Sequence, residues 1–451
     1  MEVTFHGAVG TVTGSRFMVS TATTKVLIDC GLFQGVKVLR RRNRRPPTFD
    51  AAELDAVVLT HAHVDHSGYL PALLERGFDA PVYATAPTCD LCQILLRDAG
   101  RLQEEEARYA NRKGYSRHSP ARPLYTEQDA IAVLDRFEAR PWLEPFTVGD
   151  LCFEYLPAGH ILGAASVRVS DEAGHSVLFS GDLGRDDDLI MYPPVEPPRA
   201  DVVVMESTYG DRLHRDQDPI VQLGAVAKRT LERGGVLLIP AFAVGRAQAM
   251  LLALDEVFAR GLAPRAPIYL NSPMANAVSA LYHTYTQEHR LTKREIDRLF
   301  GKVRFIRSES ESRDLNRQRG PMVIVSASGM LSGGRVLHHL RAFGPEASTT
   351  IVIAGYQAAG TRGRKLLEGA QYIKIHGHSV RINAEVVPIN LFSAHGDRDD
   401  LTRWLRGLPQ PPREVVLVHG EPAAADALRS HLQSELGWHV HAADAGERVQ
   451  L

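Results

Sequence analysis

The chain carries a dense group of metal-ligand side chains near its N-terminus: His61, His63, Asp65 and His66, in the order H-x-H-x-D-H. In an extended loop or turn, this spacing separates an imidazole pair at 61 and 63 from a carboxylate–imidazole pair at 65 and 66. Imidazole nitrogens suit zinc and other borderline ions, and a carboxylate suits zinc or manganese. Because such a group is rare among ordinary surface residues, the segment predicts metal binding and can supply two adjacent ions.

Further ligands are expected at the ends of other strands, because four residues cannot complete two metal sites. His160 (AGH), Asp182 (SGD) and His419 (VHG) each follow a strand-like segment at a glycine or a turn. Alone, each would more often be a turn residue, and Asp182 most of all, since Gly-Asp after a strand is common turn chemistry. Together with the H-x-H-x-D-H segment they become candidate ligands.

The composition is that of a globular chain with room for more than one domain. Its 451 residues correspond to about three units of core, and 44% of them are hydrophobic. The formal net charge of -1 provides no overall positive field, so any nucleic-acid surface must be a local groove. Four cysteines are too few for a disulfide framework, and neither a signal peptide nor a membrane-spanning stretch is found. These features indicate a cytoplasmic protein and exclude a small module, a disordered chain and a membrane protein.

The ends of strands must position the ligand residues. The segment Ala56–Thr60 predicts a short apolar strand that runs directly into HAHVDH. From Asp201–Glu206 onward strands and helices alternate, which indicates a parallel doubly wound sheet. We therefore expect a second domain over 208–370, after which hairpin-like strands over 372–388 resume the first architecture.

Arg40–Pro47 (RRRNRRPP) is the densest basic run of the chain. Its asparagine and prolines disfavour a helix, so the segment predicts a solvated loop. Contact with phosphates is the less favoured interpretation.

Taken together, these motifs resemble the metallo-β-lactamase superfamily, in its β-CASP branch of nucleic-acid-processing hydrolases, over essentially the whole chain. The superfamily's first four motifs match Asp29 (LIDCG), HAHVDH, His160 and Asp182, and the branch's own motifs match Glu206 (MESTYG), His395 (FSAHGD) and His419 (VLVHGE). The resemblance implies an α/β fold: a four-layer αββα sandwich with an inserted doubly wound α/β (β-CASP) domain. The expected limits are 1–207 and 371–451 for the sandwich and 208–370 for the insertion.

The resemblance also assigns roles at the metal centre. It implies two divalent ions per chain, zinc first and manganese as the alternative, with a shared hydroxide as the nucleophile. One ion would be held by His61, His63 and His160, the other by Asp65, His66 and His419, with Asp182 bridging. Asp65 is also expected to be catalytic, and Asp29 is expected to hydrogen-bond the ligand loop, although a plain turn residue is a serious alternative there.

His395 is expected to be the general acid toward the leaving oxygen, with Glu206 orienting it and tuning its pKa. Without the resemblance, His395 would be interpreted as a capping or core histidine.

Glycine- and arginine-bearing loops of the insertion are candidates for substrate contact. They are PAFAVGRAQ (240–248), SASGMLSGGR (326–335) and AGTRGRK (359–365), where backbone N–H groups and arginines could hold phosphates. The resemblance adds Ser393, which lies two residues before His395, as a further candidate for substrate contact. The predicted contact residues are Arg246, Ser328, Gly329, Arg335 and Ser393.

The predicted function is a metal-dependent ribonuclease that hydrolyses phosphodiester bonds of single-stranded RNA and leaves a 5′-phosphate and a 3′-hydroxyl. In having histidine at position 419, the sequence resembles the RNA-processing members of the branch, which favours RNA as the substrate. Action on DNA, or on both nucleic acids, is the alternative. A small-molecule hydrolase and an inactive nucleic-acid-binding scaffold are the remaining hypotheses. Internal or 5′-terminal cutting, and monomer or homodimer, are left open.

Two features resemble chemistry but are interpreted otherwise. Cys89 and Cys92 (CDLC) stand on a predicted helix over 87–114 without a second pair, which favours buried reduced thiols. His376 and His378 (IHGH) flank a glycine in a predicted hairpin and match no motif, which favours a surface turn.

Overall fold

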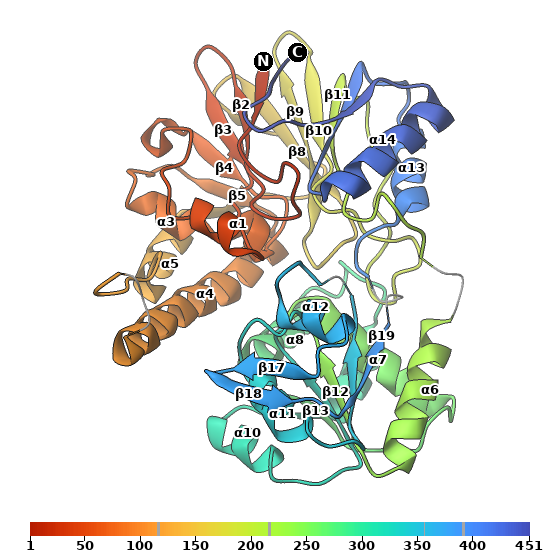
Figure 1. The fold of residues 1–451 in the computed structure, drawn as a ribbon. Coiled ribbons are helices and arrows are strands. Elements are labelled where there is room, and N and C mark those ends of the chain that lie inside the picture. Colours follow the sequence, from red (N-terminus) through yellow and green to blue (C-terminus); the bar gives the residue numbers. More distant parts are fainter. Residues whose placement is uncertain (115–117, 215–217, 356, 390–392) are drawn as a thin grey trace. The chain divides into compact units, whose positions relative to one another are not determined.

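The structure is a computed structural model that describes residues 1–114, 118–214, 218–355, 357–389 and 393–451. These residues divide into two compact units (Figure 1): unit 1 comprises Met1–Leu213 and His395–Leu451, and unit 2 comprises His214–Ala394. Unit 2 is therefore an insertion within unit 1, as the sequence predicted.

Within the described residues, unit 1 contains two seven-stranded mixed sheets. The first, in the order β22-β1-β2-β3-β4-β5-β6, consists of β1 (Glu2–Phe5), β2 (Phe17–Ser20), β3 (Lys25–Ile28), β4 (Ala56–Val58), β5 (Val82–Ala84), β6 (Phe137–Ala139) and β22 (Arg448–Gln450). The second, in the order β21-β20-β11-β10-β9-β8-β7, consists of β7 (Phe146–Val148), β8 (Leu151–Pro157), β9 (Ala165–Asp171), β10 (Ser176–Phe179), β11 (Val202–Glu206), β20 (Glu414–Val418) and β21 (Val440–Ala442).

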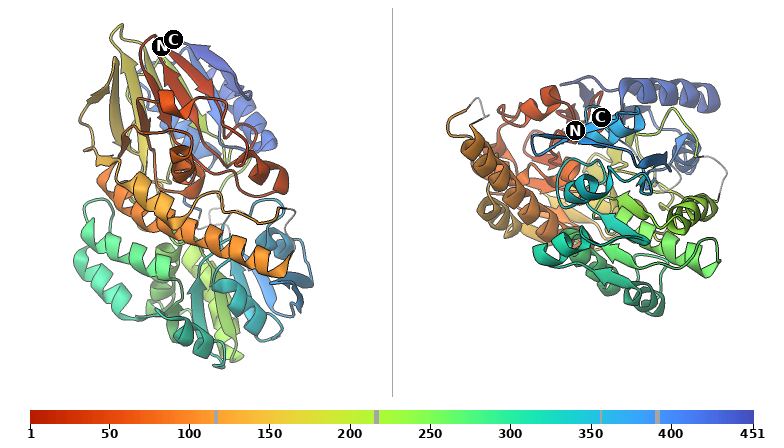
Figure 2. Two further views of the ribbon diagram at one scale, coloured as in Figure 1. Left: turned by 90° about the vertical axis from the view of Figure 1, so that its left-hand side faces the viewer. Right: turned by 60° about the horizontal axis from the view of Figure 1, so that its bottom comes forward.

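The core of unit 1 lies between these sheets. Alternate residues of β8, such as Leu151, Phe153 and Tyr155, are fully buried and pack with residues of the first sheet such as Val19 and Ile28. The period-two alternation places one face of most of these strands in this shared core. Because β1 pairs with β22, the two ends of the chain lie side by side, as Figure 2 shows.

Helices cover the outer faces of both sheets, so the expected four-layer αββα arrangement is confirmed (Figure 1). The helices of unit 1 are α1 (Lys37–Arg42), α2 (Val64–Ser67), α3 (Leu70–Leu74), α4 (Ala86–Lys113), α5 (Glu127–Leu134), α13 (Arg398–Arg406) and α14 (Pro422–Leu436), with a 3-10 turn at Ala51–Glu53. Among the described residues, no helix is both long and apolar enough to cross a bilayer.

Unit 2 is built on a parallel sheet in the order β14-β13-β15-β12-β16-β19. Its strands are β12 (Val236–Pro240), β13 (Ile268–Leu270), β14 (Val303–Phe305), β15 (Met322–Ser326), β16 (Thr350–Ile353) and β19 (Glu385–Pro388), and a separate hairpin contains β17 (Tyr372–Ile375) and β18 (His378–Arg381). Its helices are α6 (Pro219–Glu232), α7 (Arg246–Ala259), α8 (Pro273–Thr284), α9 (Lys293–Gly301), α10 (Glu309–Leu315), α11 (Val336–Phe343) and α12 (Arg362–Leu367). Every residue of β12 is buried, as expected for a central strand covered by helices on both faces.

The end of the insertion lies later in the chain than residue 370. The expected hairpin-like strands over 372–388 belong to unit 2, because β19 pairs in parallel with β16, with Thr350 opposite Glu385. A short strand carries no sign of the sheet it will join, since its partner is chosen by tertiary packing.

The segment Arg40–Pro47 is only partly the loop that was expected. Its first three residues form the end of α1, so the prediction of a loop is wrong there. Arginines in the last turn stabilise the helix C-terminus, where the backbone carbonyls concentrate negative charge. The helix ends at Asn43, whose side chain accepts the N–H of Phe33 at 2.9 Å and donates to its carbonyl at 2.8 Å.

Candidate metal centre

Adjacent parallel strands carry the candidate ligands to one edge of unit 1. In the second sheet β10, β11 and β20 are neighbours and parallel, so the residues that follow or end them, Asp182, Glu206 and His419, meet at their carboxyl ends. In the first sheet β3 and β4 are parallel and end just before Asp29 and His61. The carboxyl edges of parallel strands are common positions for active sites, since the loops there are not needed for the core.

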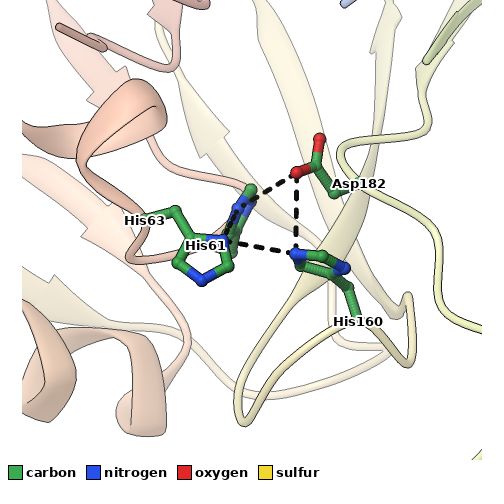
Figure 3. A group of neighbouring side chains, drawn as sticks. All are labelled: His61, His63, His160 and Asp182. Carbon is green, nitrogen blue, oxygen red and sulfur yellow. Dashed lines mark hydrogen bonds and ion pairs between the residues drawn. The ribbon is translucent and has the colours of Figure 1, made fainter. Parts of the chain in front are cut away.

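A first group consists of His61, His63, His160 and Asp182 (Figure 3). The Nε2 atoms of His61 and His160 lie 3.1 and 3.2 Å from Nδ1 of His63, and 3.5 and 3.6 Å from Oδ2 of Asp182. Ligands of a tetrahedral zinc ion at about 2.0 to 2.1 Å lie about 3.3 Å from one another. The donor atoms therefore already have the separation that such an ion requires.

A second group consists of Asp65, His66 and His419. Nε2 of His419 lies 3.2 Å from Nε2 of His66 and 3.7 Å from Oδ2 of Asp65. Asp65 and His66 lie on the short helix α2, which follows directly on the H-x-H segment. The backbone at Gly31 passes close to α2, which requires glycine there, because a Cβ atom would lie 1.6 Å from the carbonyl oxygen of Asp65.

Asp182 faces both groups with different oxygens. Oδ2 is turned to the first group, and Oδ1 lies 3.3 Å from Nε2 of His66 and 3.5 Å from Nδ1 of His419. Oδ1 is buried and makes no hydrogen bond to any described residue. A buried carboxylate oxygen in this state calls for a cation, and a shared carboxylate fits two cations side by side.

Asp29 hydrogen-bonds the ligand loop, as the sequence analysis expected. Oδ2 lies 2.7 Å from Nδ1 of His66 and accepts from the Thr60 hydroxyl at 2.8 Å, while Oδ1 accepts the Thr60 N–H at 2.8 Å. Because the carboxylate accepts at Nδ1, His66 presents Nε2 to its group as a lone pair.

Thr60 and Thr208 are site residues that the sequence analysis missed. The Thr60 hydroxyl lies 3.0 Å from Nδ1 of His61, and the Thr208 hydroxyl lies 3.1 Å from Nδ1 of His419. Each hydroxyl fixes one ring nitrogen and directs the other into the site. Their positions were a usable signal, since Thr60 adjoins HAHVDH and Thr208 lies within MESTYG.

The protonation states suit metal ligands. Burial and the imidazole of His66 lower the pKa of His61, and burial lowers the pKa of His63 to about 4. Burial disfavours the charged form of Asp182, but the histidines at 419 and 66 outweigh it and hold its pKa well below the usual range. Neutral imidazoles and an ionised carboxylate are the forms that bind a divalent cation.

The imidazole of His66 lies near two carboxylates, those of Asp29 and Asp182, whose negative charges favour a positive charge beside them. Burial disfavours its protonation, but the carboxylates of Asp182 and Asp29 outweigh burial and raise its pKa well above the ordinary value. A divalent cation beside Nε2 would supply the positive charge that these carboxylates favour.

Glu206 and His395 form a pair beside the first group. Both carboxylate oxygens of Glu206 lie near Nδ1 of His395, at 3.2 and 3.1 Å, and Oε1 also accepts the N–H of Leu183 at 2.6 Å. Nδ1 of His395 lies 3.9 Å from Oδ2 of Asp182. Burial disfavours the imidazolium, but the charges of Glu206 and Asp182 outweigh it and raise the pKa of His395 to about 9.

The predicted substrate-contact residues all lie in unit 2. Arg246 is buried at the start of α7, beside Gly355, and Ser393 is also buried. Ser328 accepts the N–H of Ser332 at 3.2 Å, and the Gly329 carbonyl accepts from Gln357 at 3.2 Å. Arg335 donates to the Asn271 side chain at 3.0 Å and to the backbone of Ile306 and Arg307, so it also ties loops of unit 2 together.

The two features interpreted as unrelated to the chemistry behave accordingly. Cys89 and Cys92 are free thiols on α4; Cys92 is buried as expected, whereas Cys89 is only half-buried. Burial nevertheless raises the pKa of Cys89 to about 12, which keeps it protonated. His376 and His378 are both exposed, His376 in the turn between β17 and β18 and His378 as the first residue of β18.

Comparison with protein families covers most of the chain. A model of the metallo-β-lactamase superfamily matches residues 10–223, and the Beta-Casp domain matches residues 247–366. The Zn-dependent metallo-hydrolase RNA specificity domain matches residues 379–443.

Several curated proteins are similar over nearly the full length. Ribonuclease TTHA0252 of Thermus thermophilus is 37% identical over 459 residues, which cover 100% of both chains. Transcription termination factor FttA of Methanocaldococcus jannaschii is 33% identical over 95% of this chain and 69% of its own length. The RNase J-like protein of the same organism is 32% identical over 92% of each chain.

Among solved structures, a protein of unknown function from Enterococcus faecalis V583 aligns over 100% of this chain and 99% of its own, with a TM-score of 0.54 and 16% identity. This likeness concerns the fold alone.

Proposed function

Since the chain belongs to the β-CASP branch of the metallo-β-lactamase superfamily, a family of zinc-dependent metallo-hydrolases, we propose that it is a metal-dependent ribonuclease that hydrolyses RNA phosphodiester bonds. The observation that carries the proposal is the carboxylate of Asp182. It turns one oxygen to each of two ligand groups and lies beside the His395–Glu206 pair. Small-molecule ester hydrolysis has no need of this additional acid.

We propose two divalent ions per chain, with zinc preferred and manganese as the alternative. His61, His63 and His160 would hold one ion, Asp65, His66 and His419 the other, and Asp182 would bridge. When bound, such ions supply Lewis acidity toward the phosphoryl oxygens and an activated water.

The side chains around this centre each have a distinct task. Glu206 holds Nδ1 of His395 and favours its protonated form, so Nε2 is the atom that delivers a proton to the leaving 3′-oxygen. Proton delivery there leaves a 3′-hydroxyl on one fragment and a 5′-phosphate on the other. Asp29, Thr60 and Thr208 keep the ligand imidazoles in the orientation that exposes their lone pairs.

The basic helix α1 is a candidate binding surface for a polyanionic substrate. Lys37 and the arginines at 40, 41, 42, 44 and 45 are exposed, in a chain whose net charge is only -1. The residues that lead into α1 are fixed to the ligand helix α2, because Cys30 N–H donates to the His66 carbonyl at 2.6 Å and Leu32 N–H donates to the Val64 carbonyl at 2.9 Å. We propose that α1 holds phosphates of single-stranded RNA next to the metal centre. The match to the RNA specificity domain over 379–443 favours RNA over DNA.

The test uses the purified chain, stripped of metal with a chelator and then supplied with zinc or manganese. End-labelled single-stranded RNA and DNA of matched sequence serve as substrates. We expect metal-dependent cleavage of RNA that is lost in Asp182→Asn and reduced in His395→Ala, while the control His376→Ala, in an exposed turn, keeps full activity. The fragment ladder distinguishes internal from 5′-terminal cutting. If RNA stays intact with every metal although two ions are bound per chain, the ribonuclease proposal fails.

A further inference from the structure

A second cluster of metal-ligand side chains lies away from the metal centre, at the edge of the second sheet in unit 1. Glu414 is the first residue of β20, His441 lies in the edge strand β21, and His439 directly precedes that strand. The parallel register pairs Val416 with His441, and the Val415 N–H donates to the His439 carbonyl at 2.9 Å. Since residues two apart share a face of a strand, this register brings the three side chains together.

The candidate ligand atoms of this cluster lie near one another. Oε2 of Glu414 lies 4.0 Å from Nδ1 of His439 and 4.0 Å from Nδ1 of His441. All three ligand atoms fall within 4.8 Å of one another. Oε1 of Glu414 accepts from Arg413 at 2.6 Å, which leaves Oε2 turned toward the histidines.

His441 is held in the tautomer that a metal ligand needs. Its Nε2 lies 2.7 Å from Oε1 of Glu447, and the other Glu447 oxygen accepts the N–H of Asp444 at 2.7 Å. A carboxylate at Nε2 requires the proton on that nitrogen, so the neutral ring carries its lone pair on Nδ1. A carboxylate–histidine pair of this kind orients histidine ligands in metal sites.

No hydrogen-bond donor among the described residues is directed at Nδ1 of His441. Nδ1 is buried and makes no hydrogen bond to the residues that the structure describes. The group that faces it is the Glu414 carboxylate, which is also an acceptor. Two acceptors that face each other are unfavourable unless a proton or a metal cation lies between them.

From this arrangement we propose that Glu414, His439 and His441 form an additional zinc site, with water in the remaining coordination position. Around tetrahedral zinc the 4.0 Å separations would close to about 3.3 Å, a shift that rotation of the side chains would have to supply. His439, with 68% of its side chain exposed, is placed to make it. The ion ties edge strand β21 to β20 and so stabilises an edge of the sheet. The site goes beyond the proposed ribonuclease activity and does not depend on it.

The experiment counts zinc bound per chain after chelator treatment and dialysis against buffered micromolar zinc. We expect His439→Ala and His441→Ala each to bind one ion fewer than the unaltered protein. His441→Cys, which supplies a thiolate ligand, should keep the full count. Glu447→Gln should weaken the affinity of this ion about tenfold, since it removes the charge that fixes the ring.

The matched control is His283→Ala, an exposed histidine that also has a carboxylate partner, Asp297 at 3.1 Å, but belongs to no group of three potential ligands among the described residues. It should keep the full zinc count, and RNA cleavage should be unchanged in all of these variants. A melting-temperature increase with zinc that is smaller in His439→Ala than in the unaltered protein would give the same answer independently of stoichiometry. Equal zinc counts in the unaltered protein, His439→Ala and His441→Ala would overturn the proposal, whatever the outcome of the RNA assay.

Discussion

Glu206 holds the imidazole of His395 with both carboxylate oxygens, at 3.2 and 3.1 Å from Nδ1. The two residues are 189 positions apart in the chain. The pairing fixes both the direction of the ring and its charge, because the carboxylate favours the imidazolium. It is therefore the relationship that makes His395 an acid at neutral pH.

The first prediction follows from this pair. His395→Ala should lower kcat about 10²- to 10⁴-fold with little change in KM, because a positioned proton donor acts only in the transition state. The measurement is steady-state cleavage of a fluorogenic single-stranded RNA. A change in KM alone would assign His395 to substrate binding instead.

Glu206→Gln should move the basic limb of the pH–rate profile to lower pH. His395 must be protonated to act, so activity is lost as the pH rises through its pKa. The carboxylate raises that pKa, and bound cations lower it from about 9; removal of the carboxylate charge lowers it further. An unchanged basic limb in Glu206→Gln would contradict the assignment of His395 as the acid.

Asp29→Asn should weaken metal binding without removing a ligand. The amide that replaces one carboxylate oxygen would face Nδ1 of His66 as a donor and favour the wrong tautomer, so we expect a 10- to 100-fold loss of metal affinity. Competition with a chromophoric chelator measures it. Asp201→Asn is the matched control, since Asp201 accepts from Ser176 in the same unit. Equal losses in both variants would indicate a general effect on folding.

Replacing Arg40, Arg41 and Arg42 together with alanine should raise KM for single-stranded RNA and leave kcat nearly unchanged. Removal of each arginine that neutralises a phosphate should reduce the slope of log KM against log salt by about 0.7. Replacement of Arg406, which is exposed on α13, and Arg429, which is half-buried on α14, provides the control. The same salt slope in both variants would exclude α1 from the substrate path.

His339 should make unit 2 less stable in acid. Burial, together with the charges of His338 and Arg335, lowers its pKa to about 3, and its ring accepts from Asn271 and donates to Asn316, each at 2.6 Å. The unfolded chain binds the proton more readily between pH 6.5 and 3. The contribution of neutral His339 to the free energy of unfolding is therefore fully present above pH 6.5. It falls as the pH is lowered, by about 2 kcal/mol at pH 5.

The test compares thermal unfolding at pH 7.5 and pH 5 for the unaltered protein and His339→Gln. The variant should be less stable at pH 7.5 but should lose less stability on acidification. An equal loss in both proteins would show that other groups govern the acid limb.

Local spacing made much of the metal centre predictable. HAHVDH indicates its chemistry within six residues, and His160, Asp182 and His419 stand at strand ends that alternation of apolar residues reveals. The change from antiparallel strands to alternating strands and helices indicated the doubly wound inserted domain, and the resemblance to the metallo-β-lactamase superfamily implied the four-layer sandwich. The end of the insertion could not be predicted from the pattern, because β19 has a composition that suits either sheet and joins β16 only through tertiary packing.

The residue types available for metal chemistry can be recognised from spacing over a few residues, and the fold that holds them from their resemblance to a known family. How these residues combine depends on the tertiary structure. The two-sided placement of Asp182, the fixing of His66 by Asp29 and the meeting of Glu414 with His441 join segments far apart in the chain. Such contacts depend on strand order and register, and no local pattern encodes them.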